Sequence, residues 1–247
     1  MSIGIIGNGF VGSAILHGFM LHAEDIMIYD NNPKISTHTL EELVSESKVV
    51  FVCVPTPMYE SGECDLSIIE SVVDQISSGI DPSGTNYTIS SCDTKKSGQV
   101  IVIKSTVVPG TVEGLAQKYP DLSFVFNPEF LTERKARLDF INTARIVLGG
   151  EDSDSLKTVE DLYRVRFPYT KIIKTDFGTA QLIKYMANCF FATKVSFMNE
   201  MHQICKALDG DWDLKALFQM VGLEILISMY LVTTEILVSE ENAFLKI

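Results

Sequence analysis

A lysine and an asparagine lie four positions apart in the segment Lys184-Tyr185-Met186-Ala187-Asn188. Residues with this separation share one face of an α-helix, one turn apart. A cation and an amide placed in this way can together stabilise an oxyanion. Taken alone, the pair is more typical of a solvent-facing lysine beside a packed asparagine, so its interpretation depends on the rest of the chain.

Three other polar segments each follow a short apolar run that predicts a buried strand. They are residues 53–57, 104–106 and 127–133. Ligands of open α/β sheets bind beyond the carboxyl ends of the strands, so we expect the three segments to share one edge of a sheet. Each alone is also typical of a proline-containing turn or a solvated acid, and a shared site explains them better together.

A fourth segment on this edge is the glycine-rich turn Gly7-Asn8-Gly9-Phe10-Val11-Gly12, which follows a predicted strand and opens a predicted helix. In such a turn the glycines allow a tight bend, a close approach of pyrophosphate and close packing of helix on strand. The next strand ends in Asp30, 21 residues after Gly9. A carboxylate there accepts hydrogen bonds from the adenosine ribose and repels the 2′-phosphate of NADP. The turn and the acid therefore predict NAD as the cofactor.

The elements that must hold these residues are short apolar runs alternating with helical patterns. Strands are predicted at residues 3–6, 26–29, 49–54, 100–103, 124–126 and 146–148, and helices at residues 11–21, 40–46, 66–77, 111–118 and 154–164. This alternation predicts an α/β fold, a doubly wound parallel sheet that forms an NAD-binding (Rossmann) domain over residues 1–175. Residues 79–98, rich in Ser, Thr, Gly and Asp, are predicted to be a surface insertion.

Residues 176–208 predict one long helix, which opens a region extending to residue 218. The helix has more apolar residues than one buried stripe needs: Leu182, Ile183, Met186, Phe190, Phe191, Val195, Phe197, Met198 and Met201. We therefore expect its second face to pack against another subunit, in a homodimer.

The composition of the chain limits the kinds of partner that it can bind. The net charge of −12 and the absence of a basic stripe argue against nucleic acid. The longest charge-free apolar stretch near the C-terminus, residues 225–234, is too short to span a membrane, and no signal peptide is evident. None of the five cysteines forms a C-x-x-C pair, so we expect no metal site and a reduced, cytoplasmic protein.

Together these motifs resemble the UDP-glucose/GDP-mannose dehydrogenase family, from Ile3 to about Leu217. The most specific parts are residues 102–106, 127–133 with 145–147, and 184–188 followed by 197–200. The resemblance implies oxidation of the C6 alcohol of a nucleotide sugar, with UDP-glucose favoured, to a carboxylate. It implies two NAD per turnover and a cysteine-bound thiohemiacetal and thioester.

The resemblance also implies roles for single residues. Glu129 would be the acid/base for thioester hydrolysis, and Lys184, with Asn188 beside it, would stabilise the oxyanion. Thr106 would help to place water, while Phe130 and Leu131, with Glu129, Lys184 and Asn188, would contact the sugar nucleotide. The basic residue usual after the ribose-binding acid is displaced by one position, so Lys34 is not included. The expected NAD contacts are Gly7, Asn8, Gly9, Phe10, Val11, Gly12, Asp30, Val52, Cys53, Val54, Pro55, Thr56, Ser105, Thr106 and Glu133.

One part of the family pattern is missing. The family's nucleophile lies in a G-F-G-G-x-C-x-P-K-D motif preceded by D-G-R-I-G, and neither string occurs in this sequence. Both can be recovered from residues 219–247 if the reading frame is displaced, although the free choice of synonymous codons inflates the match. We therefore expect a frameshifted, non-native tail over residues 219–247 rather than a naturally diverged one, an absent C-terminal UDP-sugar domain and an inactive chain.

Two other functions stay open. β-Hydroxyacid dehydrogenases also place a lysine and an asparagine one turn apart after a Rossmann domain, but they need no cysteine. Residues 104–106 and 127–133 argue against them. The other alternative is a non-catalytic NAD-binding remnant, or a dimerisation partner for an intact subunit.

Overall fold

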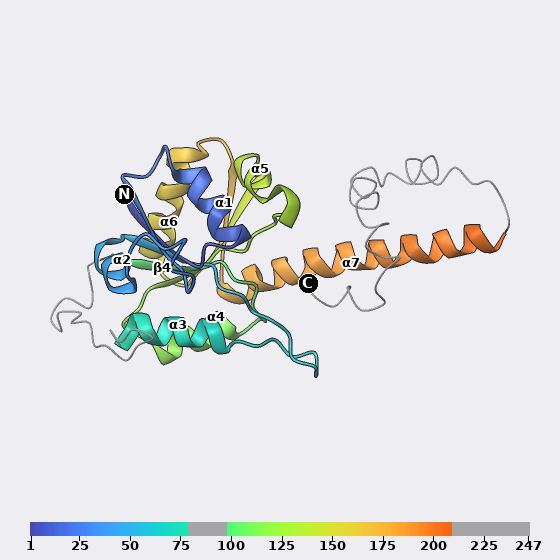
Figure 1. Cartoon of the computed structure of the whole chain (residues 1–247), viewed down its shortest axis with the longest axis horizontal. Coiled ribbons are helices and arrows are strands. Elements are labelled where there is room, and N and C mark those ends of the chain that lie inside the picture. Colours follow the sequence, from blue (N-terminus) through green and yellow to red (C-terminus); the bar gives the residue numbers. More distant parts are fainter. Residues whose placement is uncertain (79–97, 209–247) are drawn as a thin grey trace. The chain divides into compact units, whose positions relative to one another are not determined.

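The computed structural model describes residues 1–78 and 98–208 (Figure 1). All but the last residue of the predicted insertion at residues 79–98, and the predicted frameshifted tail, lie outside the described residues. The chain divides into two units, Met1–Lys184 and Tyr185–Ile247. The first unit holds the sheet and most of the candidate site.

Seven strands form a single sheet in the order β2-β1-β3-β4-β5-β6-β7. Their bounds are β1 Ser2–Ile6, β2 Asp25–Tyr29, β3 Val49–Val52, β4 Val100–Ile103, β5 Phe124–Phe126, β6 Arg145–Gly149 and β7 Lys171–Thr175. The helices are α1 Phe10–Phe19, α2 Leu40–Glu46, α3 Ser67–Ser78, α4 Thr111–Lys118, α5 Ala136–Ile141, α6 Ser153–Arg166 and α7 Phe177–Ala207, with a short 3₁₀ turn at Glu133–Lys135. The α/β prediction is confirmed.

The expectation of a wholly parallel sheet is wrong at one place. β5 and β6 pair antiparallel through Phe126 and Gly149, whereas every other neighbouring pair is parallel. The connection from β5 to β6 passes through the 3₁₀ turn and the short helix α5, which the sequence analysis did not predict. β6 and β7 then run parallel to each other at one edge of the sheet.

Helices cover both faces of the sheet, as a doubly wound fold requires (Figure 1). In β3, Val49 and Phe51 face the core beneath α1, α5 and α6, while Val50 and Val52 face the core with α2, α3 and α4. Side chains of a strand point alternately to its two faces, which is why its apolar run is continuous. Each buried aliphatic side chain stabilises the fold by about 1.5–3 kcal/mol relative to its exposed state.

The strand β7 was missed because its sequence, Lys-Ile-Ile-Lys-Thr, is not a continuous apolar run. β7 is an edge strand, so Lys171 and Lys174 can stay exposed while Ile172 and Ile173 pack one on each core. Charged residues on edge strands are ordinary because only one side of the strand is paired. β7 therefore forms because its residues pair with β6, and not because its own sequence is strongly hydrophobic.

The long helix is present as predicted. Asp176 caps its first turn, because its carboxylate accepts hydrogen bonds from the backbone nitrogen and the hydroxyl of Thr179. One turn later Gln181, fully buried, donates to Glu113 of α4 at 2.7 Å. These contacts hold the first turns of α7 and connect them to α4. Among the described residues, no helix is long and apolar enough to cross a membrane.

Candidate active site

The glycine-rich turn between β1 and α1 leaves no room for side chains at two of its glycines. Gly7 has φ +88°, and a Cβ there would lie 2.6 Å from the carbonyl oxygen of Cys53. A Cβ on Gly12 would lie 2.0 Å from the carbonyl oxygen of Gly7. Gly9 differs, because a Cβ there would meet nothing within 4 Å. The open space at Gly9 lies at the N-terminus of α1, where backbone amides favour a pyrophosphate.

Asp30 follows the last residue of β2, and its side chain contacts the glycine-rich turn. Its carboxylate accepts a hydrogen bond from the backbone nitrogen of Asn8 at 2.7 Å and another from that of Asn32 at 2.9 Å. Both contacts fix the orientation of the carboxylate. The acid is therefore already placed beside the glycine turn, as a ribose-binding acid must be.

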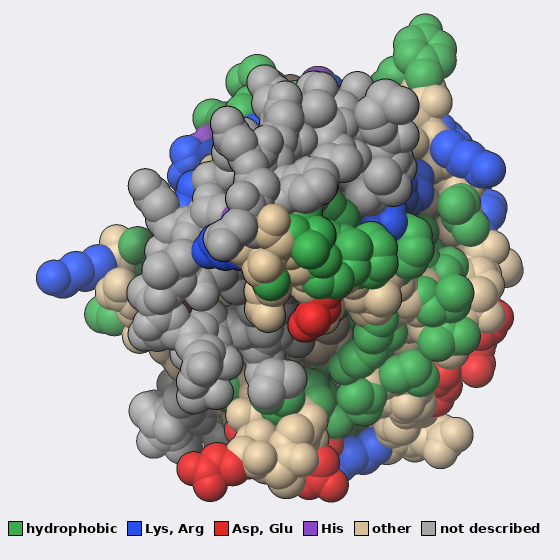
Figure 2. Space-filling model, turned by 90° about the vertical axis from the view of Figure 1, so that its right-hand side faces the viewer, with side chains coloured by type: hydrophobic (Ala, Val, Ile, Leu, Met, Phe, Trp, Pro, Cys, Tyr) green, Lys and Arg blue, Asp and Glu red, His purple; other side chains and the backbone are tan. Residues whose placement is uncertain are grey.

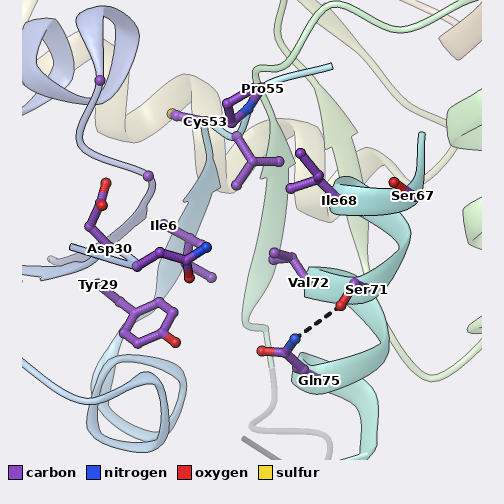
Figure 3. A pocket seen from close by; sticks show the side chains of 14 residues that line it. Ile6, Tyr29, Asp30, Cys53, Pro55, Ser67, Ile68, Ser71, Val72 and Gln75 are labelled. Carbon is purple, nitrogen blue, oxygen red and sulfur yellow. Dashed lines mark hydrogen bonds between the residues drawn. The ribbon is translucent and has the colours of Figure 1, made fainter. Parts of the chain in front are cut away.

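A cavity of about 670 Å³ opens between this turn, the segment after β3 and helix α3 (Figure 3). Six predicted cofactor contacts line it: Gly7, Gly9, Asp30, Cys53, Val54 and Pro55. The cavity lies where the strand order reverses between β1 and β3, the usual ligand position in such sheets. Its shape and lining fit the adenosine half of NAD.

Helix α3 supplies cavity residues that the sequence analysis did not assign. They are Ser67, Ile68, Ser71, Val72 and Gln75. Gln75 donates a hydrogen bond to Ser71 at 3.1 Å, drawn as the dashed line in Figure 3. The position of α3 at the far side of the cavity cannot be predicted from a motif near the glycine turn. The apolar face of α3 itself, formed by Ile69, Val73 and Ile76, places this helix.

A second cavity, of about 510 Å³, lies on the other side of the glycine turn. Asn8, Gly9, Phe10 and Glu133, all predicted NAD contacts, line it. Gly9 lines both cavities. Several predicted cofactor residues thus line two cavities that share one open glycine, which suits an extended dinucleotide.

The segments after β3 and β4 are tied together by hydroxyl groups. Ser105 donates to the carbonyl oxygen of Val54 at 2.7 Å, and Thr56 donates to that of Thr106 at 2.6 Å. Ser105 is buried and Thr56 is half-buried. The Ser105 hydroxyl therefore has a structural partner besides any cofactor contact.

The predicted acid/base and the predicted oxyanion-stabilising lysine form an ion pair. Lys184 Nζ lies 2.7 Å from Glu129 Oε1, and the two side chains are only 6% and 15% exposed. The other oxygen of Glu129 accepts a hydrogen bond from the backbone nitrogen of Leu131 at 2.6 Å. Lys184 is thus buried, which rules out the solvent-facing interpretation of this lysine. Asn188 belongs to the second unit and lies one turn further along α7.

Phe130 lies beside this pair. Its ring centroid is 4.7 Å from the guanidinium carbon of Arg145 and 5.8 Å from Lys184 Nζ. Both distances suit cation–π attraction. Phe130 therefore lies among the cations at the carboxyl edge of the sheet.

A buried polar network next to the pair was not predicted. Lys104 Nζ donates to Asn127 Oδ1 at 3.1 Å, and the hydroxyl of Tyr163 donates to the same oxygen at 2.5 Å. Burial lowers the pKa of Lys104 to about 8, and burial also raises the pKa of the Tyr163 phenol. The available signal was a lysine directly after a buried apolar run, because buried lysines are rare. Tyr163 lies on α6, and no local pattern linked it to the site.

Metal chemistry has no visible support in this region. Within residues 1–78 and 98–208, no group of three or more His, Cys, Asp or Glu side chains could hold a metal ion.

The fold and this site define the class of the protein: a dinucleotide-binding protein with a doubly wound NAD-binding domain. The chain belongs to the UDP-glucose/GDP-mannose dehydrogenase family. The NAD binding domain of that family matches residues 34–166, and its central domain matches residues 178–238. NAD is therefore its cofactor, and the open space at Gly9 and the oriented Asp30 carboxylate fit that dinucleotide.

Relatives of known name agree with the family. The chain is 32% identical over 265 residues to the UDP-glucose 6-dehydrogenase of Rickettsia bellii, covering 91% of this chain and 56% of that protein. The GDP-mannose dehydrogenase of Pseudomonas aeruginosa aligns with a TM-score of 0.75 at 26% identity. The UDP-glucose dehydrogenase of Pyrobaculum islandicum aligns with the same TM-score at 28% identity. Each alignment with these solved structures covers 90% of this chain and 56% of the other. The chain thus spans about half the length of these relatives.

Proposed function

We propose that this chain carries the NAD half of a nucleotide-sugar 6-dehydrogenase, with UDP-glucose as the sugar nucleotide. The observation that supports this most is the buried Glu129–Lys184 pair at the sheet edge that also carries the glycine turn. An acid and a cation in direct contact, beside a cofactor cavity, can serve an alcohol oxidation. The UDP-glucose 6-dehydrogenase relative supports the choice of sugar nucleotide.

In the full reaction an alcohol becomes a carboxylate, so four electrons leave the sugar and water supplies one oxygen. NAD, when bound, accepts a hydride in each of the two oxidations. The Lys184 ammonium would stabilise negative charge on the oxygen at C6, and Asn188 would assist it. Glu129 would accept the proton of the water that hydrolyses the thioester, with Thr106 placing this water. Phe130 and Leu131 would contact the sugar nucleotide.

The covalent step needs a thiolate, and none of the cysteines of this chain lies in the family's nucleophile motif. Cys53 interacts electrostatically with Glu129, but burial raises the pKa of its thiol to about 12. It is therefore neutral near pH 7 and a poor nucleophile. We propose that the 247-residue chain binds NAD without completing the reaction, and that residues 219–247 are a frameshifted tail, although the match to the family's central domain extends to residue 238.

Assembly and location complete the proposal. The homodimer would form through α7, on which Leu182, Met186, Phe190, Phe197 and Ile204 are each at least 49% exposed. Figure 2 shows hydrophobic side chains gathered on one face, with most charged side chains of that view nearer its margins. A cytoplasmic location remains a prediction.

The test is an assay of the purified chain with UDP-glucose and NAD, followed by NADH absorbance and by detection of UDP-glucuronate. We expect NAD binding but no turnover. Restoring the displaced frame from about Leu217, with the downstream domain, should restore activity, and changing the recovered cysteine to serine should abolish it again. The nucleotide sequence around codons 214–222 would show the break directly.

Three outcomes would contradict the proposal. Turnover of UDP-glucose by the 247-residue chain at ordinary enzyme rates, about 1–10³ s⁻¹, would mean that another nucleophile exists. Turnover of 3-hydroxy acids instead would favour a β-hydroxyacid dehydrogenase. A restored frame that still lacks activity would favour a non-catalytic remnant.

A further inference from the structure

Lys104 is a buried cation that the proposed reaction does not use. It follows the last residue of β4, and Asn127 follows the last residue of the neighbouring strand β5. Ile103 and Phe126 are in register, so Lys104 and Asn127 leave the sheet side by side. Glu129 comes two residues later in the same segment.

The head group of Lys104 is held in one place. Asn127 Oδ1 accepts from both Lys104 and the hydroxyl of Tyr163, while Asn127 Nδ2 donates to the carbonyl oxygen of Val147 at 2.7 Å. Asn127 is 2% exposed and Lys104 is 4% exposed. With both ends of the amide engaged, the acceptor cannot turn away from the lysine.

Among the described residues, the Lys104 ammonium has no carboxylate in direct contact. None of the ion pairs formed by the described residues includes Lys104. The titratable groups near enough to interact with it are Cys53 after β3, Glu129 after β5 and Lys184 on α7. Tyr163 on α6 reaches it through the shared Asn127 oxygen. Since Cys53 is a neutral thiol near pH 7, Glu129 is the anion in this group.

The charge on Glu129 depends on its cations. If Lys184 turns toward negative charge on a substrate oxygen, Glu129 loses its direct partner while only 15% exposed. A carboxylate without a partner in such a place is costly. A second, immobile cation nearby would lessen that cost without moving.

We propose that Lys104 is a positioning residue, a fixed second cation that attracts and orients the Glu129 side chain while Lys184 engages the substrate. This inference rests on the proposed function for the role of Glu129. Burial, the largest effect, lowers the pKa of Lys104 to about 8; interactions with Cys53 and then Glu129 raise that pKa, and repulsion by Lys184 lowers it. The second cation is therefore present below about pH 8 and is lost as the pH rises through that value.

The experiment follows the Lys104 side chain by NMR in the 247-residue chain, with ¹³C- and ¹⁵N-labelled lysine assigned through bonds from the backbone. We expect a titration midpoint near 8. Glu129→Gln should lower this midpoint and Lys184→Met should raise it, each on the order of one pH unit. The matched control is Asp161→Asn, which removes the exposed partner of Lys157 and should leave the midpoint unchanged.

These shifts measure the coupling in both directions, because two interacting sites change each other's affinity for protons equally. An ordinary midpoint near 10.4, or one unchanged by both Glu129→Gln and Lys184→Met, would overturn the inference. No substrate or cofactor is present in this experiment. Failure of the inference therefore leaves the proposed function standing, and failure of the turnover assay leaves the coupling standing.

Discussion

At the residue scale, the contact between Glu129 and Lys184 joins positions that are 55 residues apart in the chain. Glu129 lies just beyond β5 and Lys184 lies in the third turn of α7, so the pair also connects the sheet to the helix. The stability of this ion pair affects the chemistry that its lysine can perform. A lysine that is held by a carboxylate in a nearly dry place is oriented before any substrate arrives.

Removing one partner should therefore be costly. Glu129→Gln leaves the 6% exposed Lys184 without its carboxylate, and we expect a loss of about 3 kcal/mol in the free energy of unfolding. The double variant Glu129→Gln/Lys184→Met should recover at least about 1 kcal/mol, because the unpaired charge is gone. Urea denaturation measures both. As a control, Lys157→Met breaks the exposed pair with Asp161 and should change the free energy of unfolding far less. Equal losses at the two pairs would contradict a buried ion pair.

We expect Asp30 to determine the preference of the chain for NAD over NADP. Asp30→Ala removes the acceptor for the ribose hydroxyls, and we expect NAD binding to weaken about 10- to 100-fold. The same change removes the negative charge that repels a 2′-phosphate, so discrimination against NADP should fall. Calorimetric titration of both cofactors provides the measurement.

Asp25→Ala, at the exposed start of β2, is the matched control and should not alter binding. NADP binding to the unchanged chain as tightly as NAD would contradict this role of Asp30.

At the element scale, different glycines of the glycine-rich turn serve folding and NAD binding. Gly12 lies against the Gly7 carbonyl and serves the packing of α1 on β1, whereas Gly9 faces open space. Gly9→Ala should therefore leave the thermal midpoint within a few degrees of the original chain, since its φ of −73° suits alanine. The added methyl group would occupy the space needed by the pyrophosphate, so NAD binding should fall at least about 10-fold.

Thermal denaturation and NAD titration of Gly9→Ala check the two halves of this prediction. Gly114→Ala in α4, which also meets nothing within 4 Å, is the control. It should stabilise the chain by about 0.5–1 kcal/mol and leave NAD binding unchanged. Normal NAD binding by Gly9→Ala would mean that the dinucleotide does not approach this turn.

At the scale of the whole molecule, the exposed apolar residues of α7 predict self-association. We expect a dimer at micromolar concentration by light scattering. Phe190→Glu combined with Phe197→Glu, at side chains 57% and 54% exposed, should shift the chain toward the monomer because each buries a charge in the interface. Val165→Glu on α6, at a similar 60% exposure, is the control and should leave the mass unchanged. A monodisperse monomer of the original chain would contradict the prediction.

The sequence by itself determined much of the local architecture. Continuous apolar runs predicted six of the seven strands, and α4 falls at residues 111–118 as predicted. The glycine turn and Asp30 could be assigned from sequence, because tight turns and helix starts depend on residues adjacent in the chain. The prediction of a long helix from residue 176 also holds, since Asp176 supplies its cap locally.

Only the tertiary structure decided the features that depend on neighbours distant in the chain. β7 became a strand because β6 lies beside it, and the antiparallel contact of β5 with β6 follows from the path of the chain between them. Helix α3 closes the cofactor cavity, and Tyr163 and Asn127 hold Lys104, although no local pattern linked α3 or Tyr163 to the site. Lys184 looked solvent-facing on its own and is buried against Glu129, because packing of α7 on the sheet removes water from both charges.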